Sequence, residues 1–184
     1  MQKQNTLFWY TFFVRRFHMK REYSITLSLF LLYVALLTWI ILFKMSFSVS
    51  GLSRIRSVNL IPYGACVFIN GKLDFDEIFS NILAFVPIGV YVSMLKPRWS
   101  FAKKLLPAFG ISLIYEVMQF VLAIGASDIT DLINNTLGGL IGVLIFGLLQ
   151  KIFGEKTCKI LLGLAGVCTI LLLVLIAVLL IANL

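Results

Sequence analysis

The sequence predicts an all-α fold, a polytopic membrane helix bundle with about five transmembrane helices. Of the 184 residues, 60% are hydrophobic and only 13% are charged, and the mean hydropathy is +1.01. A water-soluble chain of this length could not bury so much apolar surface in one core. The apolar residues also gather into runs long enough to cross a bilayer, and short basic clusters separate these runs.

The charged and metal-ligating residues argue against several other classes of protein. The net charge of +8 does not indicate a nucleic-acid partner, because the basic residues lie between apolar runs, where they set membrane orientation. One histidine and three cysteines without a CxxC spacing give no zinc site and no disulfide framework. We therefore expect no metal, no cofactor and no nucleic acid, and the expected partner is membrane lipid. The histidine is His18, and the three cysteines are Cys66, Cys158 and Cys168.

Residues 1–24 are predicted to form a cytoplasmic or interfacial N-terminal segment. They mix aromatic residues with cations such as Arg15 and Arg16. Two interpretations are open: an interfacial segment with its aromatic rings at headgroup depth, or a disordered tail that carries an orientation signal. A cleavable signal peptide is not indicated, because the cations follow the aromatic residues and no small-residue cleavage site follows the apolar run.

Residues 25–149 are predicted to form a core of four membrane helices, and residues 150–184 add a basic loop and a fifth helix. The segment 44–77 is too mixed in polarity to cross a bilayer and contains an Asn70-Gly71 turn signal. Pro87 removes a backbone donor and is predicted to kink the second helix. The predicted spans are 25–43, 78–95, 105–125, 132–149 and 160–181.

The distribution of lysine and arginine predicts the orientation in the membrane. Cations dominate the N-terminal segment and the loops 96–104 and 150–159, which must share one side of a five-span bundle. The link 128–131 on the other side is acidic. The positive-inside rule then gives a cytoplasmic N-terminus and an extracellular C-terminus. Cys66 should therefore react with a membrane-impermeant thiol reagent on intact cells, and Cys158 should not.

Glu116 is the most informative polar residue, because it lies inside the third apolar run. An ionisable group within a membrane helix is costly and by default marks a functional site. Gln119 follows at a spacing of three, so both side chains share one helix face. In the predicted orientation, the outer halves of the second and fourth spans carry further amides and acids, which predicts one polar pocket open to the outside. The predicted pocket comprises Asn81, Glu116, Gln119, Asp128, Asp131 and Asn135, with Arg54 and Arg56 as nearby cations.

Several of these residues also have purely structural interpretations. Asp128 and Asp131 resemble an N-terminal cap with acids at the positive end of a helix dipole. Gly138-x-x-x-Gly142 is typical of close helix packing, and Asn81 could bridge two helices. A hard-cation site is not expected, because no EF-hand spacing is present.

Four motifs occur in order within residues 25–149, and together they resemble the VanZ-like family of bacterial membrane proteins. Many relatives carry an arginine after the glutamine, where this chain reads Ala-Ile-Gly-Ala at 123–126. If that arginine neutralises an acid in the relatives, then either Arg54 or Arg56 does so here or the pocket of this chain differs from theirs. The fifth span lies outside the strongest part of the resemblance. The motifs are Asn59-Leu60-Ile61-Pro62-Tyr63, Asn81-Ile82-Leu83-x-Phe85-x-Pro87-x-Gly89, Ser112-x-x-x-Glu116-x-x-Gln119, and Ser127-Asp128-Ile129-Thr130-Asp131 followed by Asn135-Thr136-Leu137-Gly138.

The resemblance implies a membrane protein of Gram-positive bacteria associated with low-level resistance to teicoplanin, a glycopeptide with a fatty acyl tail. Our first hypothesis is a non-enzymatic protein whose pocket binds an amphiphile at the outer leaflet, either a lipoglycopeptide or a lipid-linked wall precursor. An alternative is a membrane enzyme acting on a lipid-linked envelope substrate, with Glu116 as general acid or base; the pocket lacks histidine and an activated nucleophile. A lipid or proton-coupled transporter is a third hypothesis, although no internal repeat is visible.

Overall fold

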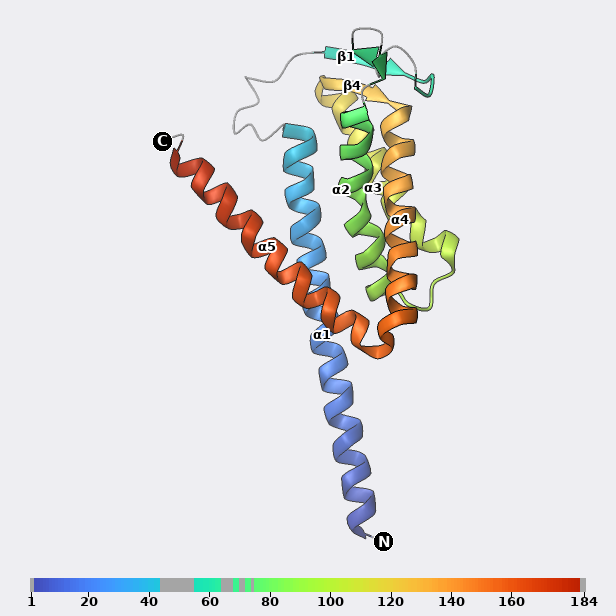
Figure 1. Ribbon diagram of the computed structural model, residues 1–184, viewed down its shortest axis with the longest axis vertical. Coiled ribbons are helices and arrows are strands. Elements are labelled where there is room, and N and C mark those ends of the chain that lie inside the picture. The colour runs from blue at the N-terminus through green and yellow to red at the C-terminus, as the bar shows by residue number, and fades with distance from the viewer. Residues whose placement is uncertain (1, 44–54, 64–67, 70–71, 74, 183–184) are drawn as a thin grey trace.

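The computed structural model of the chain is a bundle of long helices with short strands at one end (Figure 1). It describes residues 2–43, 55–63, 68–69, 72–73 and 75–182. The helices are α1 (Gln2–Phe43), α2 (Phe75–Leu95), α3 (Phe101–Leu122), α4 (Ile129–Phe153) and α5 (Thr157–Ala182), and the 3₁₀ turn η3 (Gly154–Lys156) joins the last two. The strands are β1 (Ile55–Asn59), β2 (Phe68–Ile69), β3 (Lys72–Leu73) and β4 (Ile124–Asp128).

Four helical stretches of the described chain are long and apolar enough to cross a membrane. The last of them is 50 residues long and contains α4, η3 and most of α5, so the five predicted spans correspond to the five helices. The predicted class, an all-α multi-pass membrane bundle, is confirmed. The four stretches are Arg21–Leu42, Phe75–Leu95, Phe101–Leu122 and Ile129–Val178.

Helix α1 joins the predicted N-terminal segment and the first span in one element. It is continuous over 42 residues and extends well beyond the other helices (Figure 1). No glycine or proline occurs in this helix, so no residue of low helix propensity separates its two parts. The predicted boundary at residue 24 is therefore a change in polarity rather than a break in the backbone.

Helices α2 and α4 make the most extensive contact in the bundle, and glycines allow it. A Cβ atom at Gly138 would collide with the carbonyl oxygen of Ile82, and one at Gly142 would collide with that of Val86. The two backbones can approach this closely only where side chains are absent. The packing interpretation of the Gly138-x-x-x-Gly142 pattern is confirmed.

Helices α1 and α3 complete the core. The rings of Phe85 and Tyr115 meet edge to face, with centroids 6.3 Å apart. The hydroxyl groups of Thr38 and Tyr115 lie 2.9 Å apart and link α1 to α3. Helix α2 continues through Pro87 as one element from Phe75 to Leu95.

The parallel pair of β1 and β4 was not predicted. Ile55 lies opposite Ile124 and Asn59 opposite Asp128, and the pair crosses one end of the bundle (Figure 1). Helix α3 ends at Leu122, since Ala123 adopts a left-handed conformation (φ 55°, ψ 38°). The prediction of a third span up to residue 125 and a polar link after it is therefore wrong in detail. Strand pairing satisfies backbone groups that would otherwise be unpaired beside the apolar bundle.

The two ends of the bundle differ in charge and structure. The β1–β4 pair and the first turns of α2 and α4 lie at one end, which we call the strand end (Figure 1). The basic turn at 96–100 and η3 lie at the other, which we call the basic end. The assignment of the basic end to the cytoplasm stays a prediction.

Candidate functional site

Asp128 is the centre of a buried polar cluster at the strand end. It is the last residue of β4 and the N-cap of α4, and its Oδ1 accepts a 2.8 Å hydrogen bond from the backbone N–H of Thr130. Its Oδ2 accepts a 3.0 Å hydrogen bond from Nδ2 of Asn59, across the strand pair. The capping interpretation of Asp128 is confirmed, and the side chain also fixes β1 against α4.

Glu116 approaches the same residue from α3. Its Oε2 accepts a 2.7 Å hydrogen bond from the backbone N–H of Asp128, and only 8% of the residue is exposed. Its backbone carbonyl accepts a 2.6 Å hydrogen bond from Oγ of Ser127. Because α3 ends at Leu122, Glu116 lies within its last two turns, nearer the helix end than a span reaching residue 125 predicts.

Two further amides connect the cluster to the neighbouring helices. Asn81 of α2 donates a 2.6 Å hydrogen bond from Nδ2 to Oδ1 of Asp131 on α4. Asn135 of α4 donates a 2.9 Å hydrogen bond from Nδ2 to Oγ of Ser112 on α3. The bridging interpretation of Asn81 is confirmed, and polar contacts join α4 to both α2 and α3.

The segment that follows β1 contributes residues that the predicted pocket did not include. The backbone N–H of Tyr63 donates to Oγ1 of Thr130, and the Tyr63 hydroxyl donates to Oδ1 of Asn134, both at 3.0 Å. Tyr63 holds this position with a positive φ of 53°. Asn59 and Tyr63 are the first and last residues of the first family motif, so the motif marked these positions without revealing their contacts.

The remaining predicted residues lie at the edge of the cluster or outside the described chain. The side chain of Gln119 lies against Gly125 of β4, and its buried Oε1 has no hydrogen-bond partner. Arg56 lies opposite Gly125 in the strand register. Arg54 and Cys66, like the side chain of Arg56, lie outside the part of the chain that the structure describes.

The cluster is rich in acceptors. Glu116 lies close enough to Asp128 and Asp131 for the carboxylates to repel one another when ionised. The partners that the structure shows for these carboxyl groups are backbone N–H groups and asparagine amides. The described residues contain no group of three His, Cys, Asp or Glu side chains arranged to hold a metal ion. The arrangement suits hydrogen-bond acceptance.

An apolar cavity that is open on one side lies between α5 and helices α1, α2 and α4. Its volume is about 350 Å³, and α1, α2, α4 and α5 all contribute to its walls. Tyr33, Pro87, Val90 and Leu164 are among the lining residues. The α2 residues that line this cavity lie between Asn81 and the basic end of the helix. The cavity therefore provides apolar surface on the basic-end side of the polar cluster.

These features define a multi-pass membrane protein in which buried acids and amides close one end of a helix bundle. The VanZ/LLP1 family model matches residues 30–150, which contain every residue of the cluster. The chain therefore belongs to the VanZ/LLP1 family, and the resemblance found in the motifs is confirmed. It is similar to Protein VanZ of Enterococcus faecium, with 34% identity over 131 residues, which are 70% of this chain and 78% of that protein. No solved structure is a significant match.

Proposed function

We propose that the protein binds an amphiphile of the cell envelope at the outer leaflet and thereby lowers susceptibility to lipoglycopeptides of the teicoplanin type. The observation that carries this proposal is the group of carboxyl side chains at the strand end: Glu116, Asp128 and Asp131. Their known partners are neutral donors. Family membership supports the association with teicoplanin resistance.

The chemistry of the cluster favours a ligand that donates hydrogen bonds. Helix bridging alone requires no charge, since Gln or Asn would make the same contacts without the cost of placing carboxylates in a membrane bundle. Gln119 Oε1 and Asn135 Oδ1 are buried and without partners, so acceptors remain in the cluster. The hydroxyl, amide and ammonium groups of a glycopeptide or a wall precursor are donors of the matching kind.

The apolar part of an amphiphile needs a second surface. The cavity between α5 and the bundle is lined almost entirely by hydrophobic side chains and is large enough, at about 350 Å³, to take part of an acyl chain. A headgroup at the strand end and a chain directed into the bundle interior would use both surfaces of this protein.

Glu116→Gln tests the proposal. The amide oxygen of Gln can still accept the hydrogen bond from the backbone of Asp128, so the fold should survive while the carboxylate is lost. We expect teicoplanin susceptibility to return to the level of a host without the protein. Glu155→Gln is the matched control, because this exposed residue lies at the basic end. Unchanged protection by Glu116→Gln at equal protein levels would remove the cluster from the mechanism.

One observation favours an enzyme as the second candidate. The carboxyl group of Glu116 is held by a hydrogen bond from the backbone N–H of Asp128, and a fixed carboxyl group of this kind could act as a general acid or base. In this case purified protein would convert a lipid-linked wall precursor or the drug to a product of different mass. If mass spectrometry finds both compounds unaltered while cells that contain the protein remain protected, the enzyme is excluded and the binding function is retained.

A further inference from the structure

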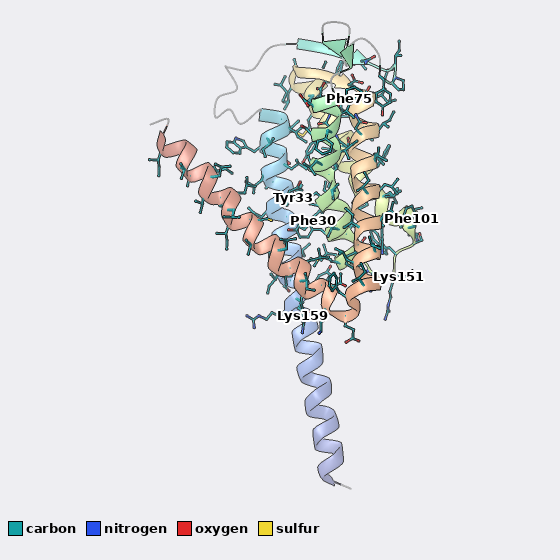
Figure 2. All side chains as sticks on the ribbon, in the orientation of Figure 1. Phe30, Tyr33, Phe75, Phe101, Lys151 and Lys159 are labelled. Atoms are coloured by element: carbon teal, nitrogen blue, oxygen red, sulfur yellow. The ribbon has the colours of Figure 1, made fainter. Side chains whose placement is uncertain are left out.

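A second groove lies at the basic end, far from the polar cluster. It has a volume of about 450 Å³ and lies between the first turn of α3 and the last turns of α4. Figure 2 shows Lys151 of α4 beside the start of α3 at Phe101. Lys104 and Lys151 provide its cations, Leu144 and Leu148 are among its apolar walls, and none of its lining residues is acidic.

Neighbouring residues indicate that this groove lies at the level of lipid headgroups. Trp99 is 40% exposed, and Nζ of Lys96 lies 5.7 Å from the centre of its ring. Tryptophan and lysine at the end of a membrane helix are typical of the membrane–water interface. Leu148 and Leu144 lie about one and two helical turns from Lys151 towards the middle of α4, so the groove becomes apolar with distance from the basic end.

The polar end of the groove is suited to an anion. Nζ of Lys104 lies 6.0 Å from the ring centre of buried Phe146, which holds the ammonium group over the groove. Ser100, the N-cap of α3, makes no side-chain cap hydrogen bond, so it leaves the first-turn N–H groups of α3 available beside these lysines. Two lysines and a helix N-terminus therefore border a groove whose walls are apolar.

We propose that this groove binds an anionic glycerophospholipid. The phosphate lies between Lys104 and Lys151, and one acyl chain follows Leu148 and Leu144 across the open surface of Gly147. Basic pockets between membrane helices recognise anionic lipid headgroups in this way. The proposal does not depend on the function assigned to the polar cluster.

Native mass spectrometry of the full-length protein in detergent tests the charge requirement. Phosphatidylglycerol and phosphatidylcholine with identical acyl chains are the probes. Each lysine near an anionic headgroup contributes roughly a factor of five to binding, so Lys104→Gln/Lys151→Gln should lower phosphatidylglycerol retention by about 25-fold. The control Lys156→Gln/Lys159→Gln removes the same charge from exposed positions at the same end and should keep the wild-type preference. Equal losses in both variants would overturn the proposal.

Gly147→Leu tests the apolar half of the groove without changing its charge. A Cβ atom at Gly147 meets no heavy atom within 4 Å, so a side chain can start there, and a leucine would extend into the path of the acyl chain. We expect phosphatidylglycerol retention to fall several-fold, while binding of soluble glycerol phosphate stays as in the wild type. Unchanged retention of the lipid would mean that the lysines attract a phosphate alone, and would overturn the lipid assignment.

Discussion

The strand end and the basic end of the bundle handle polar groups in opposite ways. At the strand end, Asp128 and Glu116 are buried and make hydrogen bonds within the protein. At the basic end, Lys151, Lys156 and Lys159 are exposed. Helix α4 connects the two ends, since it begins directly after Asp128 and carries Lys151 in its last turn.

This difference indicates which end of the molecule is more sensitive to substitution. A buried polar group that loses its partner costs about 1–3 kcal/mol, whereas most exposed charges can change with little effect on stability. Asp128, for example, makes hydrogen bonds with residues of β1, α3 and α4. Each exposed lysine of the basic end depends mainly on the membrane surface.

The largest expected contrast is in access from the two sides of the membrane. Ser57 on β1 and Ser100 before α3 are both exposed and lie at opposite ends. In a background without native cysteines, Ser57→Cys should react with an impermeant maleimide on intact cells. Ser100→Cys should react only after permeabilisation, because the positive-inside rule places the basic end in the cytoplasm. The reverse pattern would invert the orientation.

A smaller contrast is expected between two glycines of α4. At Gly138 a Cβ atom would collide with the backbone of α2, so Gly138→Ala should lower the free energy of unfolding by about 1–3 kcal/mol. At Gly147 the space is open, so Gly147→Ala should be neutral or stabilising by up to ~1 kcal/mol. Titration with a denaturing detergent, followed by circular dichroism, measures both. Similar values for the two variants would contradict the close α2–α4 approach.

The smallest effect concerns the helix cap. Asp128→Ala removes the acceptor for Thr130 and the partner of Asn59, with an expected loss of about 0.5–2 kcal/mol. Asp128→Asn keeps an acceptor oxygen and should recover most of this stability. Lys156→Gln at the basic end should change the free energy of unfolding by no more than ~0.5 kcal/mol. The same assay measures all three, and an Asp128→Ala variant as stable as Lys156→Gln would make the cap dispensable.

The helices and most of the cluster could be predicted because their signals are local. Hydropathy alone locates the spans, and the spacing of Asp128 and Asp131 before an apolar run predicts the cap. The depth of Asn81 and Glu116 in their runs predicts that both approach the start of α4. The structure pairs Asn81 with Asp131 and Glu116 with Asp128 at the strand end.

The strand pair and its contacts could not be predicted, because they depend on distant segments. Nothing in Ile-Arg-Ser-Val-Asn at 55–59 indicates a partner 69 residues further along the chain. The end of α3 at Leu122 also lacks a sequence signal, since Ala123 is a residue that rarely adopts a left-handed conformation. The same tertiary contacts explain why the roles of Thr130 and Asn134 in holding Tyr63 could not be inferred.

The pairing of β1 with β4 has a consequence for biosynthesis. The ribosome makes β1 before α2, α3 and β4, so β1 waits without its neighbour while two further helices enter the bilayer. Only when the chain has passed Asp128 can Asn59 acquire its carboxylate partner. The pairing of β1 with β4 can therefore form only after synthesis has reached the start of the fourth helix, and any shorter nascent chain has β1 without its partner strand.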